Sequence, residues 1–481
     1  MHPDIQEIQR LRQEGNVIPV YRSVIADFLT PVSVFLKLEK DRQYAFLLES
    51  VEGGETVARY SFLGCDPFLI CRFRKGQPAT EFMQNLRSTL RRFKSVKIEG
   101  LPPFTGGAVG YFGYDMVRTI EDIPDTGRDD LGVDDAALMF YKTILAFDHL
   151  RHQIHIISNL LVDESSDPIE KQYADATDEI RRIEALLRTP LEPPKSTPNY
   201  DELQVRSNFE KSDYLKAVAT AKEHIAAGDI FQVVLAQRFE VDLKTHPFEI
   251  YRALRIVNPS PYMYYLKMPD ATIVGSSPEM LVKIQGREAS YRPIAGTRPR
   301  GANDLEDEKL AQELAADEKE RAEHIMLVDL GRNDLGRVCT YGTVRVEDLM
   351  FIERYSHVMH LVSALRGELP EGVDRLDTMM ACFPAGTVSG APKVRAMEII
   401  DALEPTRRGV YSGAIMYLDF SNNLDSCIAI RTLVVKGNKG YIQAGGGIVA
   451  DSIPEGEYME TVNKSRALLR AIQLAQRGFE I

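Results

Sequence analysis

The chain has 481 residues, of which 44% are hydrophobic and 27% are charged, as in ordinary globular proteins. Its formal net charge of -12 argues against nucleic-acid or anionic-membrane binding, because both need clustered Lys and Arg. The five scattered cysteines include no CxxC pair, which favours reduced thiols over a disulfide framework. No apolar run reaches membrane-spanning length and the N-terminus lacks the core of a signal peptide, so we expect a soluble cytoplasmic protein.

Short apolar segments bounded by Gly, Pro and Asp fill the first part of the chain. They predict antiparallel strands at residues 33–39, 44–50, 59–64, 106–114, 142–148 and 153–162. Apolar residues at helical spacing then predict a helix over 172–189. Residues 189–199 carry four prolines, which block helical and ladder hydrogen bonds, so we predict a linker or an exposed crossover there.

The part of the chain after this linker mixes strands with longer helices. The patterns predict one helix over 307–330 and another over 454–476. Predicted strands include 271–277, 412–420, 426–437 and 440–450. Strands and helices do not alternate strictly, which favours an α+β fold over a doubly wound α/β sheet.

Two glutamate pairs are the first candidates for chemistry. Glu320 and Glu323 lie three residues apart on one predicted helix, and Glu457 and Glu460 on the other, so each pair shares a helix face. If the two faces meet, four like charges need a hard cation, and carboxylate oxygens are what Mg2+ prefers. The alternative is a solvated helix face, since glutamate is mostly exposed.

Two glycine-rich segments predict close approach of a ligand. Gly386 and Gly390 form a turn before a helix that we expect to begin at Pro392, and N–H groups at such a helix start suit an anion. Its spacing does not fit a phosphate-binding P-loop, and an ordinary turn is the alternative. Residues 445–447 are three glycines after a strand, which indicate either close approach of a ligand or a bulge.

Two single side chains complete the candidates from residue chemistry. His360 has a side chain that titrates near neutrality and could protonate a leaving group, although a lone His is more often a packed or surface residue. Arg431 is a charge in a predicted apolar strand and needs a partner, either a ligand carboxylate or a nearby Asp or Glu.

The second part of the chain resembles the chorismate-utilising enzymes in eight blocks that occur in the family's order. These blocks are IFQVVLAQRF, NPSPYMYYL, GSSPEMLV, RPIAGTRPRG, DEKERAEHIMLVDLGRND, HVMHLVS, FPAGTVSGAPK and AGGGIVADSIPEGEYMET. The first part resembles the family through LLES at 47–50 and GGAVGYFGYD at 106–115. The resemblance implies antiparallel sheets in a β-sandwich core flanked by helices. It also implies an N-terminal region (1–195) with a feedback-site motif and a chorismate-binding catalytic region (205–481).

The resemblance implies a role for each matched position. It implies an Mg2+ site formed by Glu320, Glu323, Glu457 and Glu460. It implies catalytic roles for His360, Glu279 and Thr387, and it leaves Glu279 and His360 both open as the base that removes a ring proton. It implies substrate contacts by Gly296, Thr387, Tyr411, Arg431, Gly445 and Gly447.

Two positions separate the branches of the family. Isochorismate and salicylate synthases place a water-activating Lys where this chain has Gln232, and aminodeoxychorismate synthases commonly place a Lys where it has Ala295. The chain therefore resembles the anthranilate synthases, which convert chorismate and ammonia into anthranilate and pyruvate. The alternatives are an aminodeoxychorismate synthase, which releases no pyruvate, and a non-catalytic ligand sensor, which need not keep the Glu pairs and His360.

The resemblance also implies a partner and an inhibitor. Ammonia would come from the hydrolysis of glutamine, a reaction that needs a nucleophilic Cys on a G-x-C-x-G turn. Cys65 lies in LGCDP instead. We therefore expect a separate glutamine amidotransferase subunit. LLES and NPSPYM resemble the family's tryptophan feedback site, although ordinary strand and turn residues are the alternative. The residues implied for that site are Glu49, Ser50, Pro261, Tyr262 and Met263.

Overall fold

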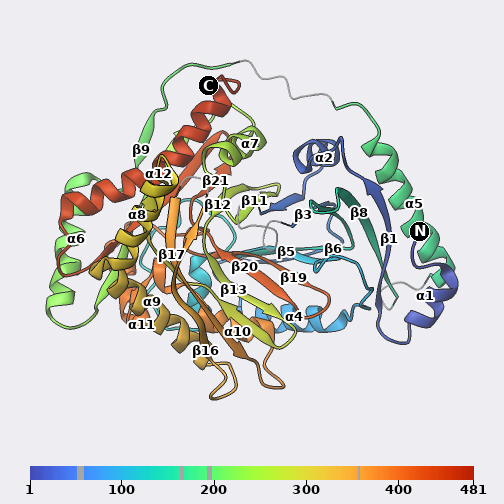
Figure 1. Ribbon diagram of the computed structural model, residues 1–481, viewed down its shortest axis with the longest axis horizontal. Coiled ribbons are helices and arrows are strands. Elements are labelled where there is room, and N and C mark those ends of the chain that lie inside the picture. Colours follow the sequence, from blue (N-terminus) through green and yellow to red (C-terminus); the bar gives the residue numbers. More distant parts are fainter. Residues whose placement is uncertain (51–58, 163–166, 192–197, 356–357, 481) are drawn as a thin grey trace.

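The computed structural model describes residues 1–50, 59–162, 167–191, 198–355 and 358–480, in which two large antiparallel sheets form the centre (Figure 1). The first sheet consists of β1 (Val17–Ile25), β2 (Ala45–Glu49), β3 (Tyr60–Cys65), β7 (Thr143–Asp148), β8 (Gln153–Leu161), β9 (Val205–Ser207), β10 (Gln232–Asp242), β11 (Tyr262–Lys267), β12 (Thr272–Ser277), β18 (Gly390–Ala391), β21 (Thr432–Lys436) and β22 (Lys439–Ile448). Its strands follow the order β1-β8-β7-β3-β2-β11-β12-β21-β22-β10-β18, with β9 paired to β10.

The second sheet has the order β15-β17-β14-β13-β20-β19-β5-β6-β4, with β16 paired to β17. Its strands are β4 (Leu69–Phe73), β5 (Gly107–Phe112), β6 (Ala136–Tyr141), β13 (Met280–Gln285), β14 (Glu288–Tyr291), β15 (Ile294–Pro299), β16 (Arg345–Arg354), β17 (Val358–Glu368), β19 (Ala414–Asp419) and β20 (Leu424–Ile428).

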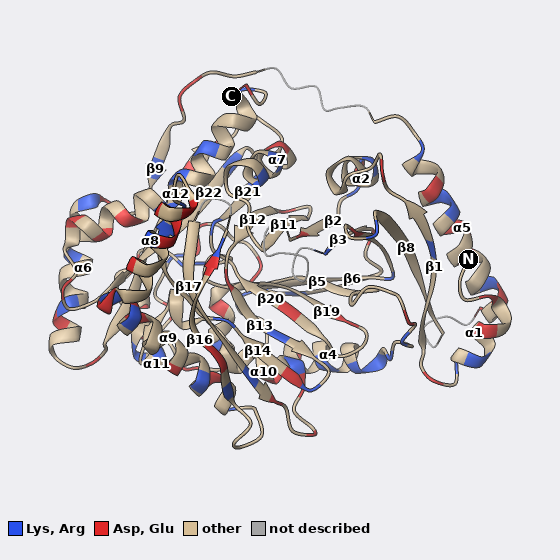
Figure 2. Ribbon diagram, viewed as in Figure 1, with Lys and Arg blue, Asp and Glu red and all other residues tan. Residues whose placement is uncertain are grey.

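Helices cover the outer faces of both sheets. They are α1 (Ile5–Leu11), α2 (Pro31–Leu38), α4 (Ala79–Arg92), η1 (Tyr114–Thr119), α5 (Ile169–Leu187), α6 (Lys211–Ala226), α7 (Pro247–Val257), α8 (Asp304–Ala316), α9 (Glu318–Gly336), α10 (Arg375–Cys382), η2 (Gly386–Val388), α11 (Lys393–Leu403) and α12 (Pro454–Gln476). Figure 2 shows charged residues concentrated on these helices, whereas the strands are mostly uncharged. No helix in the described part of the chain is both long and apolar enough to cross a membrane.

The interior between the sheets is apolar and aromatic. Phe46 of β2 packs against Tyr141 of β6, with ring centroids 4.7 Å apart, so side chains of the two sheets interdigitate. A second cluster packs α2, α5, α7 and α12 on the first sheet, and a third packs α4, α9 and α10 on the second sheet. The predicted α+β sandwich flanked by helices is therefore confirmed.

Both sheets join the two sides of the predicted linker. In the first sheet β2 pairs with β11, which places Glu49 opposite Met263. In the second sheet β5 pairs with β19, which places Phe112 opposite Ala414. The regions 1–195 and 205–481 therefore share both sheets. Residues 192–197 of the linker lie outside the described part.

Most of the predicted elements are present, and α12 spans the predicted residues 454–476. The predicted strand at 33–39 is wrong, because these residues belong to helix α2. Thr30 and Ser33 form a capping box there, and Val34, Phe35 and Leu38 are buried at helical spacing. The apolar run is short, so its composition alone did not distinguish a strand from a buried helix.

Three further expectations need correction. The single helix predicted over 307–330 is two helices, α8 and α9, separated by Asp317, whose side chain caps the start of α9. The single strand predicted over 426–437 is β20 followed by β21, and Arg431 lies between them with φ of 49° rather than within a strand. Pro392 is the N-cap of α11 and not its first helical residue.

Candidate active site

A cavity of about 620 Å³ brings together the side chains that the sequence singled out. Strands β10 and β22 of the first sheet, β15 and β17 of the second, and helices α9 and α12 all contribute to its wall. The predicted catalytic and substrate-contacting residues that line it are Gly296, Glu279, His360, Thr387, Tyr411, Arg431, Gly445 and Gly447. Glu323, Glu457 and Glu460 line it too, whereas Glu320 is not part of the lining.

The three glycines of β22 allow other groups to approach the strand closely. The strand pairs with β10 in continuous register, with Gly445 opposite Ala236 and Gly447 opposite Val234, so the bulge alternative is wrong. A Cβ atom added at Gly445 would lie 2.8 Å from the Tyr411 hydroxyl oxygen, and one added at Gly446 would lie 2.9 Å from Glu457 Oε2. Glycine is therefore needed here to admit these two side chains.

Each glutamate of the two helical pairs has its own surroundings. Glu320 lies 3.3 Å from Arg298, and Glu460 pairs with Lys464 at 2.7 Å. Desolvation of its carboxyl group, followed by the charge of Glu320, raises the pKa of Glu323, although the residue as a whole is exposed. Burial also raises the pKa of Glu457, while the hydroxyl of Ser452 donates a hydrogen bond of 2.6 Å to its Oε1.

One carboxylate oxygen among these glutamates has surroundings that suit a divalent cation. Glu457 Oε2 is buried and has no hydrogen-bond partner in the described part of the chain, so it is an acceptor in need of a cation or a donor. Within the same described residues, no three His, Cys, Asp or Glu side chains converge as metal ligands. The metal site therefore stays a prediction.

Glu279 is the most strongly perturbed acid of the cavity. It follows β12, and burial raises its pKa to about 8. The Thr387 hydroxyl, the Ile294 backbone N–H and the positive charges of Arg431 and Lys464 oppose this rise. A carboxyl group of this kind carries its proton at neutral pH and can release it to a reacting group.

His360 is held by an edge of the second sheet. It lies on β17 opposite Thr297 of β15, and its Nδ1 is 3.0 Å from the carbonyl oxygen of Gly296. A carbonyl oxygen only accepts, so Nδ1 carries a hydrogen and donates it. This bond fixes the orientation of the ring and places a hydrogen on Nδ1.

The turn before α11 contributes to the cavity through its first residues only. Thr387 and Val388 of η2 line the wall, and no described residue of α11 does. Lys393, at the start of α11, instead forms a buried ion pair of 2.7 Å with Asp334 of α9. The predicted anion site at the start of this helix is therefore not part of the cavity.

Lys464 is the residue whose role the sequence did not reveal. Its spacing of four residues from Glu460 is that of an ordinary helix-stabilising pair, and the two side chains do form an ion pair of 2.7 Å. In the structure its Nζ donates to the carbonyl oxygen of Gly445 at 2.9 Å, and the side chain lines the cavity. Lys464 lies seven residues after Glu457, which is two helical turns, so the shared helix face was a usable signal.

Comparison with known proteins places this site in a family. The chain matches the chorismate binding enzymes over residues 43–470. It belongs to that family. A relative from Acetivibrio thermocellus named anthranilate synthase component 1 is 50% identical, with 98% of this chain and 99% of the relative covered. One from Aquifex aeolicus with the same name is 45% identical, with 99% of each chain covered.

Solved structures of chorismate binding enzymes share the fold. Anthranilate synthase component I from Streptococcus pneumoniae superposes with a TM-score of 0.78 at 35% identity, covering 93% of this chain and 99% of that one. The menaquinone-specific isochorismate synthase of Escherichia coli reaches 0.71 at 19% identity, covering 97% and 98%, which is a likeness of fold alone.

A second, smaller cavity of about 210 Å³ contains the five residues predicted for the regulatory site of this chorismate binding enzyme. They are Glu49, Ser50, Pro261, Tyr262 and Met263. Glu49 is the last residue of β2 and is buried. Its carboxylate accepts a hydrogen bond of 2.5 Å from the hydroxyl of Tyr251. Burial raises the pKa of Glu49, and the charge of Arg255, whose Nε lies 3.0 Å from Oε2, opposes that rise.

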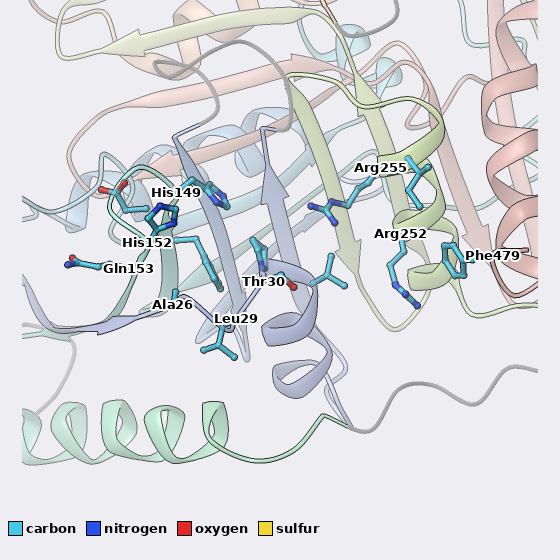
Figure 3. Close-up of a pocket in the computed structure, with 14 residues that line it drawn as sticks. Ala26, Leu29, Thr30, His149, His152, Gln153, Arg252, Arg255 and Phe479 are labelled. Atoms are coloured by element: carbon cyan, nitrogen blue, oxygen red, sulfur yellow. The ribbon is translucent and has the colours of Figure 1, made fainter. Parts of the chain in front are cut away.

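Arg255 reaches Glu49 from the wall of another cavity of about 600 Å³. Figure 3 shows Arg252 and Arg255 projecting from α7 on one side of that cavity, with His149 and His152 on the other. Arg252 pairs instead with Glu249 of its own helix at 2.5 Å. The two arginines therefore share a cavity wall and differ in the acid that each one contacts.

Proposed function

We propose that this protein is the chorismate-converting subunit of an anthranilate synthase. It would convert chorismate and ammonia into anthranilate, pyruvate and water, the first committed step of tryptophan synthesis. One observation carries the proposal. Gln232 and Ala295, which occupy the positions of the lysines used by other branches, line the same cavity as Glu279 and His360. Gln232 offers no base to activate water and Ala295 offers no nucleophile, so ammonia is left to attack the ring directly.

The residues of this chain supply binding and proton transfer. Arg431 suits a ligand carboxylate through its two-pronged donors, and Tyr411 and Thr387 offer hydroxyl groups in the same cavity. As ammonia forms its bond to the ring, the ring hydroxyl leaves as water with a proton from His360. A base then removes the proton from the aminated carbon, the bond to the pyruvyl oxygen breaks, and the ring becomes aromatic. Glu279 and His360 are the candidates for that base.

Mg2+ is the proposed cofactor. Glu320, Glu323, Glu457 and Glu460 would hold it, and when bound it would neutralise the substrate's ring carboxylate. The unsatisfied oxygen of Glu457 and the raised pKa values of Glu323 and Glu457 support this assignment, because a bound cation would stabilise carboxylates whose charged form is disfavoured by desolvation first and by neighbouring glutamates second.

The proposed regulation and partner follow from the same assignment. Tryptophan would occupy the smaller cavity, with its ammonium group on Glu49 and its ring among the apolar side chains of that cavity. A glutamine amidotransferase subunit would supply ammonia. We assign the feedback motif to region 1–195 and catalysis to region 205–481, since the lining of the larger cavity runs from Gln232 to Leu468.

The test uses the purified chain alone with chorismate, Mg2+ and ammonium at mildly alkaline pH. We expect anthranilate fluorescence with an equal amount of pyruvate, and loss of both on adding a chelator. Glutamine in place of ammonium should give no product until an amidotransferase subunit is added. Chorismate consumption without pyruvate would instead identify an aminodeoxychorismate synthase, and no consumption in the presence of ligand binding would identify a sensor.

A further inference from the structure

A buried ion pair lies directly behind the wall of the larger cavity. Glu404 follows the last residue of α11, and Arg408 comes four residues later. Their carboxylate and guanidinium form two hydrogen bonds, Nε to Oε2 at 2.9 Å and Nη2 to Oε1 at 2.6 Å. The side chains are 1% and 3% exposed, for Arg408 and Glu404 respectively, and neither belongs to the cavity lining.

All five N–H groups of the Arg408 guanidinium are used within the protein. Besides the two bonds to Glu404, Nη1 donates to the carbonyl oxygen of Val388 at 2.7 Å and to Ser412 Oγ at 3.2 Å. Nη2 donates to the carbonyl oxygen of Val234 at 2.7 Å. A guanidinium has five donors, so no donor remains for a ligand. Arg408 can act on the substrate only through the groups that it holds.

The groups that it holds are three separate parts of the cavity wall. Val234 lies on β10, Val388 lies in η2 directly after Thr387, and both line the cavity. The guanidinium carbon also lies 5.6 Å from the ring centre of Tyr411, whose side chain lines the cavity as well. Glu404 Oε1 adds a further tie, since it accepts the backbone N–H of Ala236 at 2.9 Å.

The geometry points to Arg408 and Glu404 as a positioning pair that sets the spacing between Thr387, Tyr411 and β10 in the substrate cavity. This inference rests on the proposed function, because it assigns the pair a part in binding chorismate. A buried ion pair is an expensive way to stabilise a fold, since both charges must be taken out of water. Fixing three wall segments relative to one another is what the planar five-donor group achieves and an apolar side chain of the same volume does not.

A second buried arginine provides a matched control. Arg375 of α10 has a side chain that is 4% exposed and pairs with Asp419, whose side chain is 3% exposed. It donates to the carbonyl oxygens of Asp419 and Asn423 at 2.6 and 2.8 Å, and thereby joins α10 to the turn between β19 and β20. None of these three residues lines the larger cavity. Replacing Arg375 should therefore cost stability without moving the substrate-contacting groups.

The experiment compares Arg408→Lys, Glu404→Gln and Arg375→Lys in the full chain. A lysine keeps the charge but has three donors, so Arg408→Lys must release some of the wall segments. We expect Arg408→Lys to raise the KM for chorismate about tenfold or more with a smaller change in kcat, because displaced contacts weaken ligand binding. Arg375→Lys should lower the thermal midpoint of unfolding about as much as Arg408→Lys does. It should leave the KM for chorismate within about twofold of the wild-type value.

Chorismate binding by calorimetry, with Mg2+ and without ammonium, separates this inference from the proposed function. Weakened binding in Arg408→Lys and Glu404→Gln, but not in Arg375→Lys, supports the positioning pair even if the wild-type product is not anthranilate. Equal KM and binding in Arg408→Lys and the wild type would overturn it. Equal weakening in Arg375→Lys would overturn it as well, because the effect would then follow general stability. If Arg408→Lys does not fold, Glu404→Gln, which keeps the shape of the acid, replaces it in the comparison. Weakened chorismate binding in Glu404→Gln then supports the positioning pair, and binding equal to that of the wild type overturns it.

Discussion

The two cavities of the protein use the chain in different ways. Among the described residues, the lining of the larger one, of about 620 Å³, comes from positions between Gln232 and Leu468, and many of these side chains are charged or polar. The smaller one, of about 210 Å³, joins Leu48 to Ser50, Tyr60, Phe62 and Pro103 with strands from the other half of the sequence. The proposed catalytic site therefore belongs to one half of the sequence, whereas the proposed regulatory site exists only where β2 pairs with β11.

Among the described residues, each cavity contains one buried glutamate, and the two glutamates have different neighbours. Burial raises the pKa of Glu279 to about 8, although the charges of Arg431 and Lys464 oppose this rise. Glu49 is also buried, but Arg255 lies 3.0 Å from it and opposes the rise of its pKa. Burial therefore raises the pKa of both glutamates, and Glu49 differs in having the guanidinium of Arg255 close enough to form an ion pair that favours its charged form.

The strongest test of this comparison is Glu279→Gln. The amide cannot exchange a proton, so we expect kcat to fall by about 10³- to 10⁴-fold, while tryptophan still binds in the smaller cavity. Product analysis in parallel with a His360→Ala variant identifies the base: the variant that lacks it should consume chorismate and accumulate an amino adduct that retains its pyruvyl group. Glu249→Gln, a change at another buried glutamate outside the larger cavity, is the control. A kcat unchanged in Glu279→Gln would remove this residue from the chemistry.

The same substitution should change how stability depends on pH. The pKa of Glu279 is about 8 in the folded chain against an ordinary value of 4.5, so the folded state retains a proton that the unfolded state releases. The stability that this proton supplies is complete below pH 4.5 and is lost as the pH rises to about 8. Relative to the wild type, Glu279→Gln should therefore gain up to about 5 kcal/mol at pH 9 over its value at pH 4.

Urea unfolding at pH 4 and pH 9 measures this effect. A difference between variant and wild type that does not change with pH would show that Glu279 keeps its ordinary pKa. The control is again Glu249→Gln. A confirmed pH dependence would mean that the larger cavity retains a group which costs stability at alkaline pH, as a proton-transferring acid in an apolar setting must.

Sequence reasoning located the parts of the larger cavity better than those of its supporting structure. The spacing of Glu457 and Glu460 and the three glycines after a strand were readable because each depends on local geometry alone. The role of Arg408 was not readable, because it depends on contacts with β10 and η2, which are distant in sequence. The strand wrongly predicted at 33–39 has the same origin, since burial against the first sheet permits a short apolar run to be helical.

The regulatory cavity gives the next prediction. Glu49→Gln removes the negative charge that would meet the ammonium group of tryptophan, so we expect tryptophan affinity to fall about 100-fold with turnover nearly unchanged. Replacing Ser50 should likewise abolish inhibition and spare turnover. Glu39→Gln is a matched control, because Glu39 is also buried and pairs with Lys267 of β11 but does not line the cavity. Full inhibition by tryptophan in Glu49→Gln would separate this cavity from regulation.

The smallest expected effect concerns the arginine behind Glu49. Burial raises the pKa of Glu49 and Arg255 lowers it, so Arg255→Met should raise that pKa further. Tryptophan inhibition needs the ionised carboxylate, and it should therefore weaken as the pH falls, with a midpoint that lies higher in Arg255→Met than in the wild type. Arg252→Met should leave the midpoint in place, because Arg252 lines the same cavity wall (Figure 3) but pairs with Glu249. Inhibition curves between pH 5 and 9 measure the shift. Equal midpoints in the two arginine variants would mean that the charge of Arg255 does not control Glu49, and the comparison of the two buried glutamates would then rest on burial alone.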